Sequence, residues 1–291
     1  MRALVRSSSA SYNRVWFITG SSGGLGRALA EAVLARGERA AVTARTPERV
    51  RDLIERYPAQ ALVLELNVIN REQVRKVVAQ AADSFGRIDV LVNNAAYGQL
   101  GAIEELDDAQ IRRQFETNVF GLFDVTRAVL PVMRRARRGH IINVSSVGGF
   151  AGQARLGAYN SSKFAVEGFS EALAQELAPA GIRVTIVEPG RFTTDWTGRL
   201  PTVVPTDIAD SAPPTGATGR DRRHQPGDPA RAADAIIAAV DSDVPPLRLV
   251  LGPDSLAGIR AKLAAVTAEL SAWESISAGT VVHEVVEAEA N

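Results

Sequence analysis

The sequence of 291 residues contains no cysteine, which excludes disulfide bonds, thiol nucleophiles and metal sites with cysteine ligands. Histidine is scarce too: His140, His224 and His283 are scattered without ligand spacing, so no metal site is expected. Neither sign of charge is in excess, because 33 basic residues are matched by 33 acidic ones. Electrostatic binding to nucleic acid or to an anionic membrane is therefore not expected.

Long apolar runs are missing as well. No run approaches the ~20 apolar residues of a membrane span, and the start of the chain, MRALVRSSSASYNR, has too short an apolar stretch for a secretory signal. We therefore expect a cytoplasmic protein with no membrane partner. Residues 1–13 are polar and rich in serine, and we interpret them as a loose N-terminal extension before a single domain at residues 14–291.

Short apolar runs alternate with helical patterns along most of the chain. Continuous runs are typical of strands covered on both faces, and they predict strands at 15–18, 40–43, 61–66, 88–92, 140–144, 183–187 and 247–251. Helical spacing of apolar residues predicts helices from residue 25, at 47–57, at 71–85, within 107–138, from 157, at 228–240 and through 256–273. This alternation predicts an α/β fold with one doubly wound parallel sheet and helices on both faces.

A glycine-rich segment, Thr19 to Gly26, joins the first predicted strand to the first predicted helix. Its glycines allow the backbone to approach a pyrophosphate closely, and the free N–H groups and the dipole of a helix N-terminus face the anion. Because strand, glycine turn and helix follow one another directly, the segment predicts a dinucleotide-phosphate site.

Tyr159 and Lys163 are separated by one helical turn, so both side chains leave the same face of the helix predicted from residue 157. A lysine ammonium near a phenol lowers the phenol pKa from its usual value of about 10 and makes tyrosine an acid–base catalyst. Ser145 and Ser146 end an apolar strand, and either hydroxyl can hold a substrate oxygen against that phenol.

Taken together, these segments resemble the short-chain dehydrogenase/reductase family. Five patterns of the family occur here in the family's order. They are TGxxxGxG at Thr19–Gly26, NNAG at Asn93–Ala96, the serine-bearing strand at Asn143–Ser146, YxxxK at Tyr159–Lys163, and PG…T at Pro189-Gly190 with Thr194. The resemblance covers residues 14–194 well and the remainder in outline. It implies a Rossmann-type fold and an oxidoreductase that transfers hydride between a nicotinamide and a carbonyl or secondary alcohol.

The resemblance also implies roles for individual residues. Tyr159 is the acid–base catalyst, Lys163 supports it and holds the nicotinamide ribose, and Asn118 connects the lysine to solvent through water. The family's spacing to the tyrosine selects Ser146 over Ser145 for binding the substrate oxygen. The implied cofactor-binding residues are Gly20, Ser21, Ser22, Gly24, Leu25, Gly26, Arg45, Asn67, Asn94, Tyr159, Lys163, Pro189, Gly190 and Thr194.

The residues after the second predicted strand bear on the choice of cofactor. An acidic residue there binds the ribose hydroxyls and repels a 2′-phosphate, whereas an arginine attracts one. Ala44 and Arg45 therefore predict NADP (NADPH) rather than NAD, the alternative being that Arg45 is only a solvated charge beside a helix. Two positions depart from the family: Asn67 replaces an aspartate that meets the adenine but keeps an acceptor oxygen, and Ala96 replaces a glycine beside the cofactor ribose.

Two other functions are open at this point. A family member with epimerase or dehydratase chemistry tends to have TGxxGxxG spacing and a larger C-terminal domain, and Gly20, Gly24 and Gly26 do not match that spacing. A non-catalytic NADP-binding sensor often lacks the tyrosine or the lysine, and both are present here. The favoured function is an NADP-dependent oxidoreductase acting on a small-molecule carbonyl or alcohol substrate.

Residues 190–229 are rich in proline, glycine, threonine and aspartate and have few apolar anchors. A long irregular segment of this kind is usually functional or disordered, and we expect a substrate lid because it follows the segment that covers the nicotinamide. Tyr97 and residues 150–156 are expected to line the substrate pocket with it. Family members commonly pair their long helix and YxxxK helix with a second copy, which predicts a homodimer or homotetramer through Phe115, Leu122, Phe164, Phe169 and Leu173.

Overall fold

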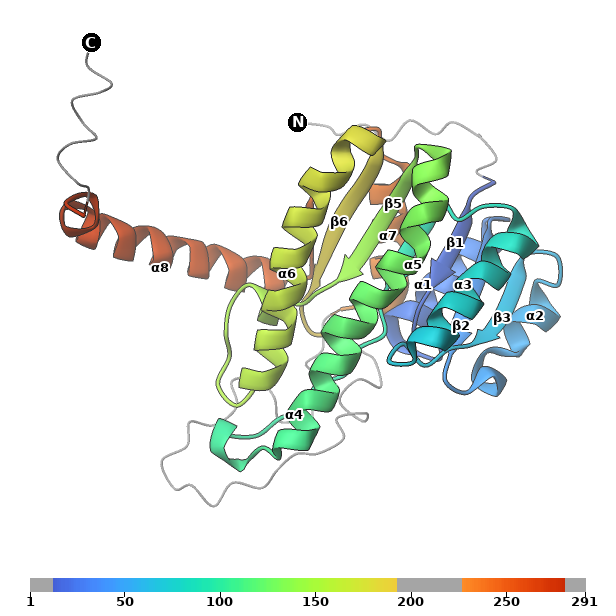
Figure 1. Cartoon of the computed structure of the whole chain (residues 1–291). Helices are drawn as coiled ribbons and strands as arrows, with labels where there is room; N and C mark the ends of the chain where they lie inside the picture. Colours follow the sequence, from blue (N-terminus) through green and yellow to red (C-terminus); the bar gives the residue numbers. More distant parts are fainter. Residues whose placement is uncertain (1–12, 193–226, 281–291) are drawn as a thin grey trace, which may run out of the picture.

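The computed structural model describes residues 13–192 and 227–280. Its centre is a seven-stranded sheet in which all strand pairs are parallel, in the order β3-β2-β1-β4-β5-β6-β7 (Figure 1). The chain winds outward from β1 in both directions, so the predicted doubly wound α/β fold is confirmed. The strands are β1 (Val15–Ile18), β2 (Arg39–Ala44), β3 (Ala61–Glu65), β4 (Val90–Asn93), β5 (Gly139–Val144), β6 (Ile182–Pro189) and β7 (Arg248–Leu251).

Helices cover both faces of this sheet. Apolar residues of α1, α2 and α7 share one core with one face of the strands, and those of α3, α5 and α6 share a second core with the other face. Trp16 and Ile18 of β1 lie in the first core and Phe17 in the second, which explains why the strands are continuous apolar runs. The helices are α1 (Gly24–Ala35), α2 (Asp52–Arg56), α3 (Arg71–Phe85), α4 (Asp108–Phe115), α5 (Gly121–Ala136), α6 (Gly157–Leu177), α7 (Pro229–Asp241) and α8 (Pro253–Ala278).

Two predicted helices are not single α-helices. The helix expected within 107–138 is divided into α4 and α5 by a π-helical turn at Glu116–Phe120. A π turn inserts a single bulge, so the apolar pattern on either side still looks helical and periodicity alone does not reveal it. The helix expected at 47–57 is a 3₁₀ turn, Pro47–Val50, followed by the short α2. The tighter turn places Val50 and Leu53 on the same side, and both are buried in the core.

The predicted subunit interface is wrong in part. Leu122 and Leu173 are buried within the protomer and cannot contact a second copy. Phe169 is half-buried and stacks on Phe123 with ring centroids 4.1 Å apart. Phe164 is exposed, so it can still take part in an interface. Helical spacing identified apolar residues correctly, but it does not say which face of α5 or α6 meets the sheet.

Several expectations fall on residues that the structure does not describe. The N-terminal extension lies outside the described residues except for residue 13, and of the expected lid only 190–192 and 227–229 are described. At the base of that segment, Phe192 and Gly227 form a parallel bridge. Within the described ranges, no helix has both the length and the apolar character that a membrane crossing requires.

A buried histidine lies between two strands of the sheet. His140 of β5 places its Nε2 2.9 Å from the hydroxyl oxygen of Thr185 on β6. Burial lowers the pKa of His140 to about 4, and the positive charges of Arg183 and Arg14 act in the same direction. The folded protein therefore keeps this imidazole neutral.

We predict that His140 makes the fold sensitive to acid. Between about pH 6.5 and pH 4 the unfolded chain takes up a proton that folded His140 excludes, so the free energy of unfolding falls as the pH falls. His140→Gln, which retains polar groups for Thr185 but does not titrate, should reduce that loss by up to about 3 kcal/mol. Urea unfolding of both proteins across this pH range measures the difference, and parallel curves would assign the acid sensitivity to other groups.

Candidate active site

The candidate residues meet at one edge of the sheet, where the carboxyl ends of the strands lie. The glycine loop follows β1, Asn94 follows β4, Ser145 and Ser146 follow β5, and Pro189 ends β6. Strands β1 and β4 are neighbours, and the chain leaves them in opposite directions. The crevice at such a reversal is where open α/β sheets bind their ligands.

The glycine loop forms a cradle between β1 and β4. Helix α1 starts within the loop, at Gly24, without a side-chain cap and without an acidic residue in its first turn, so its first N–H groups can face an anion. The Asn94 amide nitrogen donates to the carbonyls of Thr19 and Gly20 at 3.0 and 3.1 Å. A Cβ at Gly26 would overlap the Asn94 side chain and lie 2.7 Å from the Gly20 carbonyl oxygen. Only glycine allows this close approach, and the cradle fits the pyrophosphate of a dinucleotide.

The other polar residues of the loop differ in their orientation. Ser21 is buried, and its hydroxyl donates to the Ile18 carbonyl at 3.1 Å, so this side chain holds the loop in shape. Ser22 is half-exposed at the turn, and Leu25 packs at the edge of the core. The backbone of the loop, rather than the Ser21 hydroxyl, is therefore the part that can face phosphate.

The residues expected at the far ends of the cofactor are spread along the same edge. Arg45 is exposed after β2, and it has no hydrogen bond or ion pair to any residue in the described part of the chain. Asn67 follows β3 and is half-buried. The Gly190 N–H donates to the Leu251 carbonyl at 2.9 Å, which ties the end of β6 to β7. Thr194 lies outside the described residues.

Tyr159 and Ser146 are brought together at the edge. The Tyr159 phenol is buried and hydrogen-bonded to the Ser146 side chain. Ser146 also accepts a hydrogen bond from the Gly148 N–H at 3.1 Å. The Ser145 hydroxyl is buried on another side, next to the Glu167 carboxyl. Of the two neighbouring serines, Ser146 is thus the one that meets the tyrosine.

Lys163 lies beneath the tyrosine, almost entirely out of contact with solvent. Its Nζ donates to the Val144 carbonyl at 2.7 Å and lies 5.9 Å from the centre of the Tyr159 ring. Burial lowers the pKa of Lys163 to about 8, and the nearby Glu167 carboxylate partly offsets this effect.

The expectation that Lys163 lowers the tyrosine pKa is wrong for this structure. Burial raises the pKa of Tyr159 to about 12, and the hydrogen bond to Ser146 acts against this effect. The physical reason is that the ammonium group is directed to the Val144 carbonyl at the end of β5, whereas the phenol has lost its contact with water.

Asn118 lies in the π turn and connects two parts of the site. Its amide oxygen accepts from the Tyr97 N–H at 3.0 Å, and its amide nitrogen donates to the Tyr97 carbonyl at 2.8 Å and to the Ser162 hydroxyl at 3.0 Å. Ser162 is the neighbour of Lys163 on α6. Asn118 therefore holds the segment after β4 against the helix that carries the tyrosine and the lysine.

Sequence reasoning missed a group of charged residues behind Lys163. Arg248 of β7 forms ion pairs with Glu167 and Glu171 of α6 and with Glu188 of β6. Glu188 is completely buried and Glu167 nearly so. The spacing offered a signal, because Glu167 follows Lys163 by four residues just as Lys163 follows Tyr159.

The charges in this group are strongly perturbed. Burial raises the pKa of Glu167 to about 7 and also raises that of Glu188. Burial opposes the charge of Arg248, but its three carboxylate partners outweigh this and raise its pKa. The Arg248 guanidinium also lies over the Phe150 ring, 5.1 Å from its centre. The Arg248 guanidinium is thus held between the buried carboxyl groups of Glu167 and Glu188, behind Lys163.

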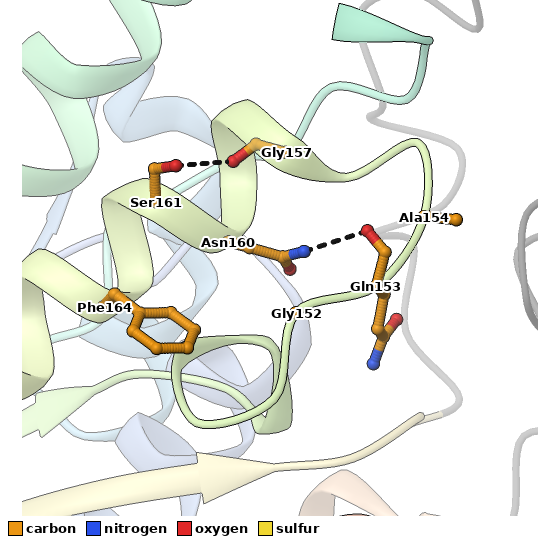
Figure 2. Close-up of a pocket in the computed structure, with 7 residues that line it drawn as sticks. All are labelled: Gly152, Gln153, Ala154, Gly157, Asn160, Ser161 and Phe164. Carbon is orange, nitrogen blue, oxygen red and sulfur yellow. Dashed lines mark hydrogen bonds between the residues drawn. The ribbon is translucent and has the colours of Figure 1, made fainter. Parts of the chain in front are cut away.

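A second feature near α6 is an open pocket of about 660 Å³ (Figure 2). In it, the Asn160 amide donates to the Gln153 carbonyl at 3.0 Å and the Ser161 hydroxyl donates to the Gly157 carbonyl at 2.8 Å. Neither Tyr159 nor Lys163 lines it, because they leave another face of α6. Part of the wall expected at 150–156 borders this pocket instead. Its lining residues are Gly152, Gln153, Ala154, Gly157, Asn160, Ser161 and Phe164.

We predict that Gly26→Ala abolishes dinucleotide binding, because the added methyl must displace Asn94 and with it the loop that faces the phosphates. The matched control is Gly168→Ala, which adds the same methyl inside α6 where no atom lies within 4 Å. That change should leave binding intact and stabilise the helix by up to about 1 kcal/mol. Fluorescence titration measures the NADPH affinity of both variants. Equal affinities would show that the glycine loop is not part of the binding site.

Comparisons with known proteins agree with this geometry. A family model described as short chain dehydrogenase matches residues 14–203. The oxidoreductase BOA17 of Botryotinia fuckeliana is 39% identical over 91% of this chain and 98% of its own length. The crystal structure of a short-chain dehydrogenase from Streptomyces avermitilis has a TM-score of 0.84 and 42% identity, covering 92% of this chain and 99% of that one.

Two further solved structures of this family contain a cofactor. A short-chain dehydrogenase/reductase of Burkholderia phymatum in complex with NAD has a TM-score of 0.76 and 25% identity, covering 88% of this chain and 95% of that one. A short chain dehydrogenase of Burkholderia cenocepacia in complex with NADP has a TM-score of 0.71 and 26% identity, covering 90% and 97%. The chain described here belongs to the short-chain dehydrogenase/reductase family and is an oxidoreductase.

Proposed function

We propose that this protein is an NADP-dependent oxidoreductase that interconverts a carbonyl group and a secondary alcohol on a small-molecule substrate. The observation that carries the proposal is the pairing of the Tyr159 phenol with the Ser146 hydroxyl at the carboxyl edge of the sheet, with Lys163 one helical turn away. A nicotinamide cofactor supplies or accepts the hydride when it is bound.

Tyr159 and Ser146 together meet the needs of the substrate oxygen. Reduction of a carbonyl builds negative charge on its oxygen, which must receive a proton and a fixed hydrogen bond. Tyr159 donates the proton, and Ser146 donates the hydrogen bond. Because burial raises the pKa of Tyr159 to about 12, the phenol is protonated at neutral pH and ready to act as the acid. Oxidation is the reverse step, in which the phenolate form of Tyr159 takes the proton from the alcohol.

We assign Lys163 to the nicotinamide ribose rather than to the Tyr159 phenol, since its ammonium is directed to the Val144 carbonyl. With a pKa of about 8, most of its ammonium is charged at neutral pH. The Glu167 carboxyl acts on the lysine rather than on the substrate, since its negative charge offsets the effect of burial. Asn118 positions this helix through Ser162.

The preference for NADP rests on the end of β2. Arg45 is exposed and has no hydrogen bond or ion pair within the described residues, so its guanidinium is available to a 2′-phosphate. Ala44 presents no carboxylate that would repel that phosphate. The exposed Phe120 and Phe164 support a further proposal, that copies associate through α5 and α6 as a homodimer or homotetramer.

Replacement of Tyr159 tests the mechanism. Tyr159→Phe removes the proton donor but keeps the ring, so turnover should fall by about 100-fold or more while NADPH affinity stays nearly unchanged. Tyr57→Phe is the matched control, because this hydroxyl accepts a hydrogen bond from the exposed, adjacent Arg56 and does not belong to the candidate site. Steady-state rates with a panel of ketones and aldehydes, followed by NADPH absorbance, measure both variants. Near-normal turnover in Tyr159→Phe would require a different catalytic acid.

Exchange of the β2 end tests the cofactor. Ala44→Asp combined with Arg45→Gln should weaken NADPH binding by about 10- to 100-fold, as expected for loss of a charge-assisted hydrogen bond and gain of a repelling charge, and should favour NADH. Arg49→Gln removes another exposed arginine nearby and should change neither affinity. Dissociation constants for both cofactors measure the ratio. Equal affinity of the unmodified protein for NADPH and NADH would contradict the assignment of Arg45.

A further inference from the structure

Helix α8 leaves the body of the protein and extends away from it (Figure 1). Its first turns pack on the body, where Ile259 is buried. Beyond that point its large apolar side chains are open to solvent: Leu263 is 51% exposed, Leu270 67% and Trp273 61%. Single exposed leucines are ordinary, but a row of large apolar residues on one element marks an interaction surface.

The apolar residues of α8 from Leu256 to Trp273 follow a regular spacing, and we call this row of side chains the α8 seam. Spacings of three and four alternate through the seam, which is the a and d pattern of a helix that packs against another helix. A surface helix that covers a globular core has a wider apolar face than this. The seam residues are Leu256, Ile259, Leu263, Val266, Leu270 and Trp273. Ile259 is buried against the body, so the part of the seam that calls for a partner helix runs from Leu263 to Trp273.

We propose that the α8 seam packs antiparallel against the α8 seam of a second copy of this chain. The charges beside the seam are divided along the helix: Arg260 and Lys262 lie near the body, and Glu269 and Glu274 lie toward the far end. All four are exposed, and none forms an ion pair with a residue in the described part of the chain.

Antiparallel pairing places the basic half of each helix beside the acidic half of its copy. Parallel pairing would instead bring Glu269 of one helix against Glu274 of the other, the g and e positions that face each other in a parallel pair, and would crowd both protein bodies at one end. The antiparallel pair is also a two-fold arrangement in which each surface meets its own copy.

A membrane surface is a poorer partner for this helix. Helices that lie in a membrane interface are rich in lysine and arginine on their polar face. In α8 the two basic residues beside the seam are balanced by two acidic ones. A second α8 satisfies the apolar seam and both sets of charges, which an anionic lipid surface does not.

The α8 contact is separate from the association proposed through α5 and α6. Helix α6 is part of the body of the protein, whereas α8 extends away from it (Figure 1). Phe164 belongs to α6, and Leu270 and Trp273 belong to α8. Two different two-fold contacts in one chain build a tetramer, and α8 alone builds a dimer. In either case, loss of the α8 contact halves the mass of the assembly.

Leu270→Glu tests the seam, because the side chain has no role in the body of the protein and the variant should still fold. We expect its mass by light scattering to be half that of the unmodified full-length chain at the same concentration. Ala268→Glu adds the same charge away from the seam and should leave the mass unchanged. A monomeric unmodified chain, or an unchanged mass in Leu270→Glu, would overturn the proposal.

Charge reversal tests the orientation. Arg260→Glu with Lys262→Glu makes both halves of the helix acidic and should weaken association at least tenfold; adding Glu269→Lys and Glu274→Lys should restore it. If the variant with all four substitutions does not regain the mass of the unmodified chain, the antiparallel arrangement is wrong. Flotation with vesicles of phosphatidylcholine and phosphatidylglycerol tests the competing partner. If the unmodified chain is monomeric and binds these vesicles, and Leu270→Glu does not bind them, the partner of the seam is a membrane and not a second copy.

Discussion

Lys163 carries an ammonium group to a position where the residue is 2% exposed. A buried charge is costly unless acceptors replace the water that it has lost. The Val144 carbonyl at the end of β5 is one acceptor, and the Glu167 carboxyl adds opposite charge one helical turn further on. Helix α6 must therefore lie in the one register that places its lysine beside the end of β5. The same register brings Tyr159 to Ser146, so the pairing of the two hydroxyls depends on where the lysine finds its partners.

The π turn before α5 supports this arrangement from the other side. Asn118 in that turn uses both ends of its amide on the Tyr97 backbone and still donates to Ser162. The segment after β4, which closes over the glycine loop, is thereby joined to the helix that bears the tyrosine. A π turn is frequent at functional sites, and here the Asn118 amide within it contacts both the segment after β4 and helix α6.

Much of the fold could be predicted because its signals are local: continuous apolar runs for strands, and a glycine turn between strand and helix. The π turn within 107–138 was missed because one bulged residue hardly disturbs helical spacing. The pKa of Tyr159 was predicted in the wrong direction, since spacing places Lys163 nearby but shows neither the burial of the phenol nor the acceptor that holds the ammonium. The Glu167 partner, Arg248, lies 81 residues away in the chain, a distance at which no local pattern connects two residues.

That separation has a consequence for synthesis of the chain on the ribosome. The ribosome makes the glycine loop, Tyr159 and Lys163 well before it reaches Arg248. Until β7 is made and added to the edge of the sheet, the buried Glu188 and Glu167 lack the Arg248 guanidinium, and Glu167 has only the Lys163 ammonium nearby. Buried acids without a partner oppose the packing of α6 on β6. The catalytic face is therefore completed only by the last strand, and products of interrupted translation that contain every recognisable motif still lack a settled active site.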